Sequence, residues 1–278
     1  MTTTETNPTG PANSQAGPAL EAVDVTLGYG GEPVFASLHL SVERGRVTTL
    51  VGANGSGKST LLKAFGRLLA PSRGAIKLDG AALATMAARQ VARHRAILPQ
   101  RPLTPPATTV RELVSRGRHP HQAWFRPWTA HDAAAVAAAL EATELTALAE
   151  RDVSTLSGGQ IQRAWIALIL AQETPLVLLD EPTTFLDLAH QLEVLRLVRR
   201  INRQRGATVL MVLHDLSLAA RFSDRLIALG GGRVMADGPA WEVLTPDLLK
   251  AAFGLDAQVI ADPATGTPLV VPASDPAA

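Results

Sequence analysis

A glycine-rich stretch carries the residues with the clearest chemistry in this sequence. Gly52, Gly57, Lys58 and Ser59 fit the pattern G-x-x-x-x-G-K-[ST], and an apolar run over 47–51 comes directly before them. Glycines let backbone N–H groups approach a polyphosphate, and a helix that begins near the lysine directs its positive dipole end at the same anion. The lysine would contact the β- and γ-phosphates, and the serine hydroxyl would bind Mg²⁺. The stretch therefore predicts a nucleotide-binding loop.

Two adjacent acidic residues follow a second apolar run. Leu176 to Leu179 is typical of a buried strand, and Asp180 and Glu181 come directly after it. An acidic residue at the end of such a strand is the usual second anchor for the Mg²⁺ held by a phosphate loop. The next carboxylate could orient or deprotonate a water molecule. A solvated turn also accounts for two adjacent acids, but it does not explain their place in a chain with a phosphate loop.

Polar residues end two further apolar runs. Gln100 follows the run at 96–98, and His214 follows the run at 208–213. Ligands of open parallel sheets gather at the carboxyl ends of the strands, so we expect these side chains near Glu181. Ser157 and two glycines stand before a helix that should begin near residue 161, either as an anion-binding helix end or simply as its cap.

Two other candidates are weaker. Tyr29 is the single tyrosine of the chain; it could be a core residue at a strand end or a ring that stacks on an adenine base. His119 and His121 have no cysteine or carboxylate at ligand spacing. We therefore interpret the histidine pair as part of an exposed loop and not as a metal site.

The elements that must position these residues follow from apolar periodicity. Alternating apolar residues predict strands over 23–29 and 38–42, and the pair 225–229 and 233–236 predicts a hairpin around three glycines. A helical stripe of apolar residues, which should lie in the core, precedes a terminating Gly206. Its members are Leu188, Leu192, Leu195, Val198 and Ile201.

These patterns divide the chain into parts. We expect a disordered tail at 1–19, an α/β nucleotide-binding core at 20–83 and 164–255, and a mainly helical insertion at 84–163. The proline-containing segment 256–278 should be an extended, peripheral tail.

The composition limits the possible functions. The 278 residues include 46% hydrophobic and 18% charged residues, and the net charge of +1 gives no electrostatic indication of nucleic-acid binding. The absence of cysteine excludes disulfides and thiolate chemistry. The N-terminus lacks the basic start and apolar core of a signal peptide, and no apolar run is long enough to span a bilayer. We therefore expect any membrane role to depend on a partner.

Taken together, these motifs resemble those of ATP-binding cassette (ABC) ATPases. The resemblance covers residues 20–255, and the sequence LSGGQ that begins at Leu156 is close to diagnostic of the family. The chain is similar to the family at Tyr29, at Gly52, Ala53, Asn54, Gly55, Ser56, Gly57, Lys58, Ser59 and Thr60, at Gln100, at Ser157, Gly158, Gly159 and Gln160, at Asp180 and Glu181, and at Asp187 and His214.

The resemblance implies how the cofactors, ATP and Mg²⁺, would be bound. Tyr29 would stack on adenine, and residues 52–60 would form the Walker A loop around the phosphates. Asp180 would be the Walker B aspartate, and the Mg²⁺ would be held by Ser59, Gln100 and Asp180.

The same resemblance implies the catalytic and dimer residues. Glu181 would be the catalytic base, His214 would contact the γ-phosphate, and Gln100 would sense the attacking water. The signature residues 157–160 would cover ATP bound by a second copy of the chain, and Asp187 would lie in the D-loop between the two copies.

A narrower resemblance concerns the cargo. The segments 116–121, 172–175, 183–191 and 214–216 look like those of importers for ferric siderophores, haem and vitamin B12, with the siderophore branch most similar. Ile161 departs from the family, because many relatives have a polar or basic residue there.

The resemblance implies an α/β fold with a RecA-like P-loop core, an antiparallel β subdomain and a helical subdomain. Such a protein would hydrolyse ATP at the cytoplasmic face of the membrane, bound to permease subunits. An extracytoplasmic substrate-binding protein would be an indirect partner.

Haem and vitamin B12 remain alternative cargoes. A soluble cassette acting on nucleic acid or ribosomes would need a basic face, a coiled-coil insertion or a second cassette, none of which is visible. A binding module without turnover fits poorly with an intact Glu181 and His214.

Overall fold

The computed structural model describes residues 17–100, 102–103, 106–122 and 127–273. Within them, no helix combines the length and apolarity needed to cross a bilayer. The strands are β1 (Leu20–Leu27), β2 (Phe35–Val42), β3 (Val47–Val51), β4 (Arg73–Leu78), β5 (Ala81–Ala82), β6 (Arg95–Leu98), β7 (Leu176–Asp180), β8 (Thr208–Val212), β9 (Arg225–Gly230), β10 (Arg233–Gly238), β11 (Ala257–Ala261) and β12 (Pro268–Pro272). The α-helices are α1 (Lys58–Phe65), α2 (Ala88–His94), α3 (Val110–Ser115), α4 (Ala130–Ala142), α5 (Gly158–Gln172), α6 (Leu188–Arg205), α7 (Leu216–Phe222), α8 (Ala240–Val243) and α9 (Pro246–Phe253). Short 3₁₀ helices are η1 (Leu83–Thr85), η2 (Arg116–His121), η3 (Thr146–Leu148) and η4 (Val153–Thr155).

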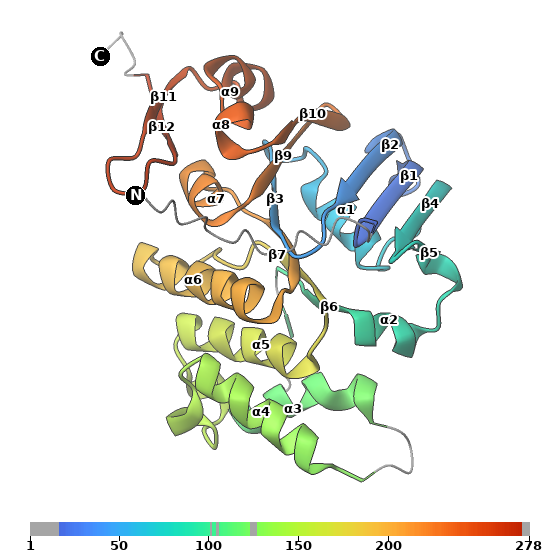
Figure 1. Ribbon diagram of the computed structural model, residues 1–278, viewed down its shortest axis with the longest axis vertical. Coiled ribbons are helices and arrows are strands. Elements are labelled where there is room, and N and C mark those ends of the chain that lie inside the picture. Colours follow the sequence, from blue (N-terminus) through green and yellow to red (C-terminus); the bar gives the residue numbers. More distant parts are fainter. Residues whose placement is uncertain (1–16, 101, 104–105, 123–126, 274–278) are drawn as a thin grey trace, which may run out of the picture.

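A six-stranded sheet in the order β10-β9-β3-β8-β7-β6 forms the centre of the molecule (Figure 1). Strands β9, β3, β8, β7 and β6 are parallel, and β10 pairs antiparallel with β9 as the expected hairpin. The parallel strands are short apolar runs that are buried on both faces, which is the usual environment of such sheets. Their carboxyl ends lie on one edge, where the polar residues of the site collect.

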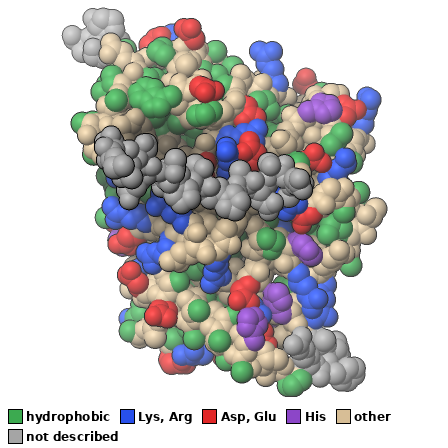
Figure 2. All heavy atoms as spheres, viewed as in Figure 1, with side chains coloured by type: hydrophobic (Ala, Val, Ile, Leu, Met, Phe, Trp, Pro, Cys, Tyr) green, Lys and Arg blue, Asp and Glu red, His purple; other side chains and the backbone are tan. Residues whose placement is uncertain are grey.

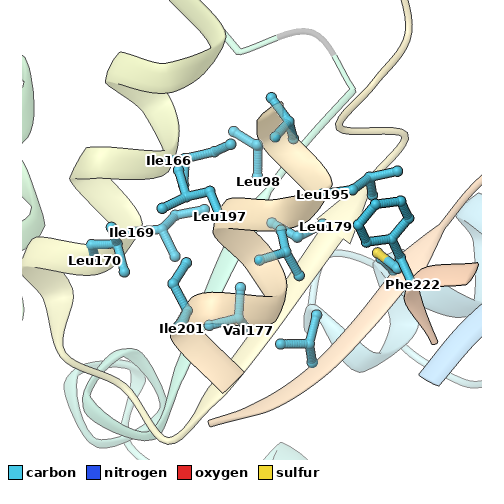
Figure 3. Close-up of a cluster of buried hydrophobic side chains, with 14 of the residues drawn as sticks. Leu98, Ile166, Ile169, Leu170, Val177, Leu179, Leu195, Leu197, Ile201 and Phe222 are labelled. Carbon is cyan, nitrogen blue, oxygen red and sulfur yellow. The ribbon is translucent and has the colours of Figure 1, made fainter. Parts of the chain in front are cut away.

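Alternate residues of each central strand enter two different cores. On β7, Val177 and Leu179 pack with α5 and α6, whereas Leu176 and Leu178 pack with α1 and the antiparallel sheet. Figure 3 shows the first core, in which isoleucines and leucines of α5 and α6 meet over the sheet. The position of the site residues at the strand ends is therefore fixed by packing on both sides of the sheet.

A second sheet, in the order β2-β1-β4-β5, is antiparallel and lies on the α1 side of the molecule (Figure 1). The expected simple alternation of β1 is wrong in its middle, because the pairing register shifts between Val23 and Thr26. Asp24 there has a left-handed backbone with φ of 52°. Leu20 and Ala22 are buried before this irregularity and Val25 after it, as expected where a bulge changes the side-chain phase.

The helical part of the molecule consists of α3, α4 and the facing side of α5 (Figure 1). The expected helical insertion at 84–163 needs correction at its start, because β6 pairs in parallel with β7 as the edge strand of the central sheet. Residues 96–98 form an apolar run in the sequence, but a run this short does not by itself show which sheet the strand joins.

Helix α6 carries the predicted apolar stripe and ends at Gly206, which has the left-handed conformation of a helix C-cap. Leu195, Val198 and Ile201 are buried as expected. The prediction is wrong for Leu188, which is 62% exposed at the first position of the helix.

The chain ends differ from simple tails. The expectation of disorder at 1–19 falls mostly outside the described residues, but Ala19 is buried and its N–H donates to the Val42 carbonyl at 2.8 Å. The segment beyond 256 forms a hairpin of β11 and β12, and β12 packs on α7.

A buried arginine joins the helical part to the core. The Arg118 side chain in η2 is 2% exposed and pairs with Asp132 of α4 at 2.9 Å and with Glu173 at 2.7 Å. It also donates to the Ala171 carbonyl at 2.6 Å. His119 and His121 lie on either side of Pro120 in a 3₁₀ helix and not in the expected loop. His119 is exposed as expected, whereas His121 is half-buried and contacts the Gln172 carbonyl.

We predict that Asp132→Asn lowers the free energy of unfolding by about 3 kcal/mol at neutral pH, because it leaves a buried guanidinium with one partner fewer. Hydrogen bonds from Thr129 and then from Arg118 hold the pKa of Asp132 well below its usual range, although burial opposes them. A carboxylate with a depressed folded-state pKa stabilises the fold above its ordinary pKa and loses that contribution as the pH falls. Urea unfolding should therefore show a difference between native chain and variant that shrinks in acid.

Glu150→Gln is the matched control, because Glu150 is an exposed partner of Arg111. It should change the free energy of unfolding by less than about 0.5 kcal/mol. Equal effects of the two substitutions would contradict a special role for the buried pair.

Candidate active site

The phosphate loop connects β3 to α1 and is shaped by its glycines. A Cβ atom on Gly52 would lie 2.3 Å from the Leu229 carbonyl oxygen. Gly57 has φ of 95°, and a Cβ there would lie 2.4 Å from the Phe35 ring. Larger residues at these two positions would clash with the neighbouring strands, so the tight loop requires glycine.

Lys58 closes the loop with two hydrogen bonds. Its Nζ donates to the carbonyl oxygens of Gly52 at 2.8 Å and Ala53 at 2.9 Å. Burial lowers the pKa of Lys58, and the charges of Glu181 and Asp180 partly oppose this effect. The ammonium group is thus held at the first turn of α1, where a phosphate would meet both its charge and the helix dipole.

Ser59 and Asp180 form the second contact of the site. The Ser59 hydroxyl donates to Oδ1 of Asp180 at 3.0 Å. Burial raises the pKa of Asp180, the Ser59 hydrogen bond lowers it in part, and the Glu181 charge raises it again. A partly buried hydroxyl–carboxylate pair is an oxygen donor set of the kind that Mg²⁺ takes together with phosphate oxygens.

Glu181 has both carboxylate oxygens occupied. Oε1 contacts Nε2 of His214 at 2.7 Å, and Oε2 accepts from Gln100 at 2.6 Å and from Thr184 at 3.0 Å. Burial raises the pKa of Glu181, but the hydrogen bonds from His214 and Thr184 outweigh it, so the net shift is downward. The side chain is therefore an ionised carboxylate, and its backbone has a left-handed φ of 52°.

Lys58, Ser59, Glu181 and His214 line a pocket of about 320 Å³. The buried Ser56 hydroxyl in the loop has no hydrogen-bond partner among the described residues, so it remains available to a ligand. Together with the backbone N–H groups and Lys58, it fits the phosphate chain of a nucleotide. The lining residues are Val34, Asn54, Gly55, Gly57, Lys58, Ser59, Thr60, Glu181 and His214.

Tyr29 lies beside this pocket and not in the core. The side chain is 63% exposed, its hydroxyl is 3.4 Å from the Thr60 hydroxyl, and Lys63 lies 5.9 Å from the ring centroid. Of the two interpretations of Tyr29 in the sequence, the exposed ring fits stacking on a base.

The signature residues lie outside the pocket of their own chain, since none of residues 157–160 lines it. Ser157 caps α5 and forms a capping box with Gln160. Asp187 caps α6 and contacts Nδ1 of His190 at 2.7 Å. A Cβ on Gly159 would lie 2.6 Å from the His190 ring, so the first turn of α6 packs on the first turn of α5.

Nothing in the sequence indicates the contacts that two residues of the site, Thr184 and His190, make. Thr184 donates to Glu181 because the chain turns sharply after β7, where the Thr184 N–H donates to the Glu181 carbonyl at 3.2 Å. His190 is one of seven histidines, and only the fold shows that it touches Gly159. Motif spacing shows neither contact, because both depend on the path of the backbone.

Comparison with known proteins agrees with this geometry. Residues 35–184 match the ABC transporter family. The achromobactin transport ATP-binding protein of Dickeya dadantii is 49% identical over 91% of this chain and 94% of its own length. The iron(3+)-hydroxamate import ATP-binding protein of Bacillus subtilis is 49% identical over 90% of this chain and 93% of its own length.

Solved structures show the same fold. A metal-chelate type ABC transporter in an inward-facing conformation is similar with a TM-score of 0.79 and 30% identity, over 92% of this chain and 98% of that one. A dimeric bacterial ABC transporter cassette is similar with a TM-score of 0.70 and 28% identity, over 80% of this chain and 98% of that one. The expected fold class is confirmed: the chain belongs to the ABC transporter family, and its fold is that of the family's ATP-binding cassettes.

Proposed function

We propose that this chain is the ATP-hydrolysing subunit of an importer for ferric siderophores, bound to a separate permease at the cytoplasmic face of the membrane. The observation that carries the ATPase part is the assembly of Lys58, Ser59, Glu181 and His214 around one pocket at the strand ends, where Ser59 also binds Asp180. These groups bring cationic, hydroxyl and carboxylate chemistry to one phosphate site.

The mechanism is phosphoryl transfer to water by positioning and charge neutralisation. Lys58 and the loop N–H groups would hold the β- and γ-phosphates, and Ser59, Asp180 and Gln100 would hold Mg²⁺, which supplies charge neutralisation when bound. Glu181 would orient the attacking water and accept its proton. Among the described residues Oε1 of Glu181 has one partner, His214, and each carboxylate oxygen accepts two hydrogen bonds, so Oε1 would accept from the water as well.

A second copy of the chain would complete each site. The signature residues 157–160 do not line the pocket of their own chain, so the ATP they contact would be bound by the other copy. Phe185 and Leu188, on either side of Asp187, are 78% and 62% exposed. Large apolar side chains at that position favour burial against another surface, and a dimeric cassette of the family shares this fold.

The permease would dock on the helical part of the chain. A groove of about 680 Å³ there is lined by residues of α3, η2 and the segments beside them. All of its lining residues except Trp128 belong to the region 100–125, which begins at Gln100 and which we expect to transmit closure of the nucleotide site. Its lining residues are Pro106, Ala107, Thr108, Arg111, Glu112, Ser115, Arg116, His119, Gln122 and Trp128.

The proposed cargo is inferred from relatives and not from a binding site, because the cargo need not contact this subunit. The two relatives described above are named for achromobactin and for iron(3+)-hydroxamate, which supports a ferric siderophore. Haem and vitamin B12 are the alternative cargoes.

Deletion of the gene should abolish uptake of radiolabelled ferric siderophore under iron limitation, and the native chain should restore it. The chain should associate with membranes only when its permease is co-expressed. Unchanged siderophore uptake with lost haem or cobalamin uptake would make the cargo wrong and leave the transporter intact. Stable binding to protein-free liposomes would contradict docking through a permease.

A further inference from the structure

Another polar groove shares no lining residue with the pocket at the phosphate loop. It has a volume of about 540 Å³ and lies between α6, the end of α7 and the turn that joins β11 to β12. Figure 2 shows Lys and Arg side chains over the part of the surface where Figure 1 places α6. The lining residues are Arg196, Arg199, Arg200, Arg203, Gln204, Arg221, Phe222, Thr265 and Thr267, without a carboxylate among them.

Most of the arginine charge in this groove is not neutralised by the protein. Arg199 pairs with Asp224 at 2.8 Å. Hydrogen bonds from the Ala264 N–H and the Thr265 hydroxyl lower the pKa of Asp262, and the charge of Arg221 adds to this effect. Arg200 has only a long contact of 3.5 Å to the Ala142 carbonyl. The Arg196 and Arg203 side chains have no hydrogen-bond or ion-pair partner within the described ranges.

The spacing along α6 brings these charges together. Arg196 and Arg200 are four residues apart, and so are Arg199 and Arg203, which makes each pair neighbours on the helix surface. Like charges at this spacing repel each other and destabilise a helix. A bound anion between the pairs would convert this repulsion into attraction.

We propose that this groove binds a small, soluble polyanion that carries two or more phosphate groups. Guanidinium groups bind phosphate oxygens with paired hydrogen bonds, and several arginines around one cavity suit several phosphates. The Thr265 and Thr267 hydroxyls are 2.8 Å apart at the groove, and Thr265 donates to the Asp262 carboxylate at 2.8 Å. A concave site of this size fits a compact polyanion better than the flat surface of a lipid bilayer.

The groove is bordered by α6 and α7, two helices that begin next to residues of the candidate active site. Helix α6 follows Asp187, and α7 follows His214 with Asp215 as its N-cap. Asp224, the partner of Arg199, also accepts from the Val47 N–H at 2.8 Å at the start of the phosphate-loop strand. A polyanion bound across α6 and α7 would therefore join the two helices that begin beside the D-loop and His214.

The test is calorimetric titration of the full chain with inorganic tripolyphosphate. The native chain should bind two equivalents, one in the phosphate loop and one in the groove. Arg196→Gln with Arg203→Gln should retain one equivalent, with groove affinity at least tenfold weaker, whereas Lys58→Ala should lose the other. Because the two sites are removed by different substitutions, failure of this proposal is distinguishable from failure of the proposed ATPase.

Arg151→Gln with Arg233→Gln is the matched control, because it removes the same charge from two exposed arginines outside the groove. It should keep two equivalents and unchanged affinity. Equal weakening in both double variants would overturn the proposal in favour of non-specific attraction. A single equivalent in the native chain that Lys58→Ala removes would overturn it, and so would groove-dependent binding to phosphatidylglycerol vesicles without binding of tripolyphosphate. The single variant Arg203→Gln provides the same comparison if the double variant unfolds.

Discussion

Lys58→Ala should abolish nucleotide binding and ATP hydrolysis together. In this structure the Lys58 ammonium lies within the loop, bound to the Gly52 and Ala53 carbonyls, with the charges of Asp180 and Glu181 nearby. With ATP bound, the same ammonium would bind the β- and γ-phosphates. Loss of two charge-assisted hydrogen bonds in a largely desolvated site corresponds to a loss of about 100-fold or more in affinity. Equilibrium binding of a fluorescent ATP analogue and phosphate release would measure the two effects.

Lys63→Ala is the matched control for this prediction. Lys63 is exposed in the same helix, and in the described part of the chain its contact is with the face of the Tyr29 ring. Lys63→Ala should reduce nucleotide affinity only slightly, because it removes the cation–π contact with the Tyr29 ring and leaves the phosphate loop unchanged. A folded Lys58→Ala protein with near-native ATP hydrolysis would show that the loop does not bind the phosphates as described.

The elements that carry the site were predictable because each is a short apolar run followed by polar residues. The strands before Gly52, Asp180 and His214 lie in one parallel sheet, so their carboxyl ends must share an edge. This is why Ser59, Asp180, Glu181 and His214 are brought together as the sequence indicates.

The contacts around Glu181 could not be predicted in the same way. They depend on a left-handed backbone at Glu181 and on a turn that returns Thr184 to the carboxylate. Neither glycine nor asparagine marks this backbone conformation, so local sequence preference gives no indication of it. The strained turn persists because the surrounding hydrogen bonds hold it.

Tertiary contacts also explain the remaining errors. Strand β6 joins the central sheet because β7 offers a parallel partner, although the sequence around it is helical. Arg118 is buried because carboxylates from two distant segments surround it, and each of them is an ordinary charged residue when read alone. Leu188 belongs to the apolar stripe of α6 yet is exposed, which is consistent with a surface that a second copy would cover.

Glu181→Gln should leave ATP binding close to native and reduce hydrolysis by about 100-fold or more, the usual contribution of a positioned general base. The substitution keeps the size of the side chain and one oxygen acceptor, whereas Lys58 and the loop are untouched, so the loss should be in kcat and not in nucleotide affinity. Since hydrolysis no longer separates the two copies, sizing chromatography with MgATP should show a persistent dimer where the native chain returns to its starting state. Glu193→Gln, an exposed glutamate on α6, is the control and should hydrolyse ATP at the native rate. Native turnover in Glu181→Gln would exclude Glu181 as the base and direct attention to His214, its 2.7 Å partner.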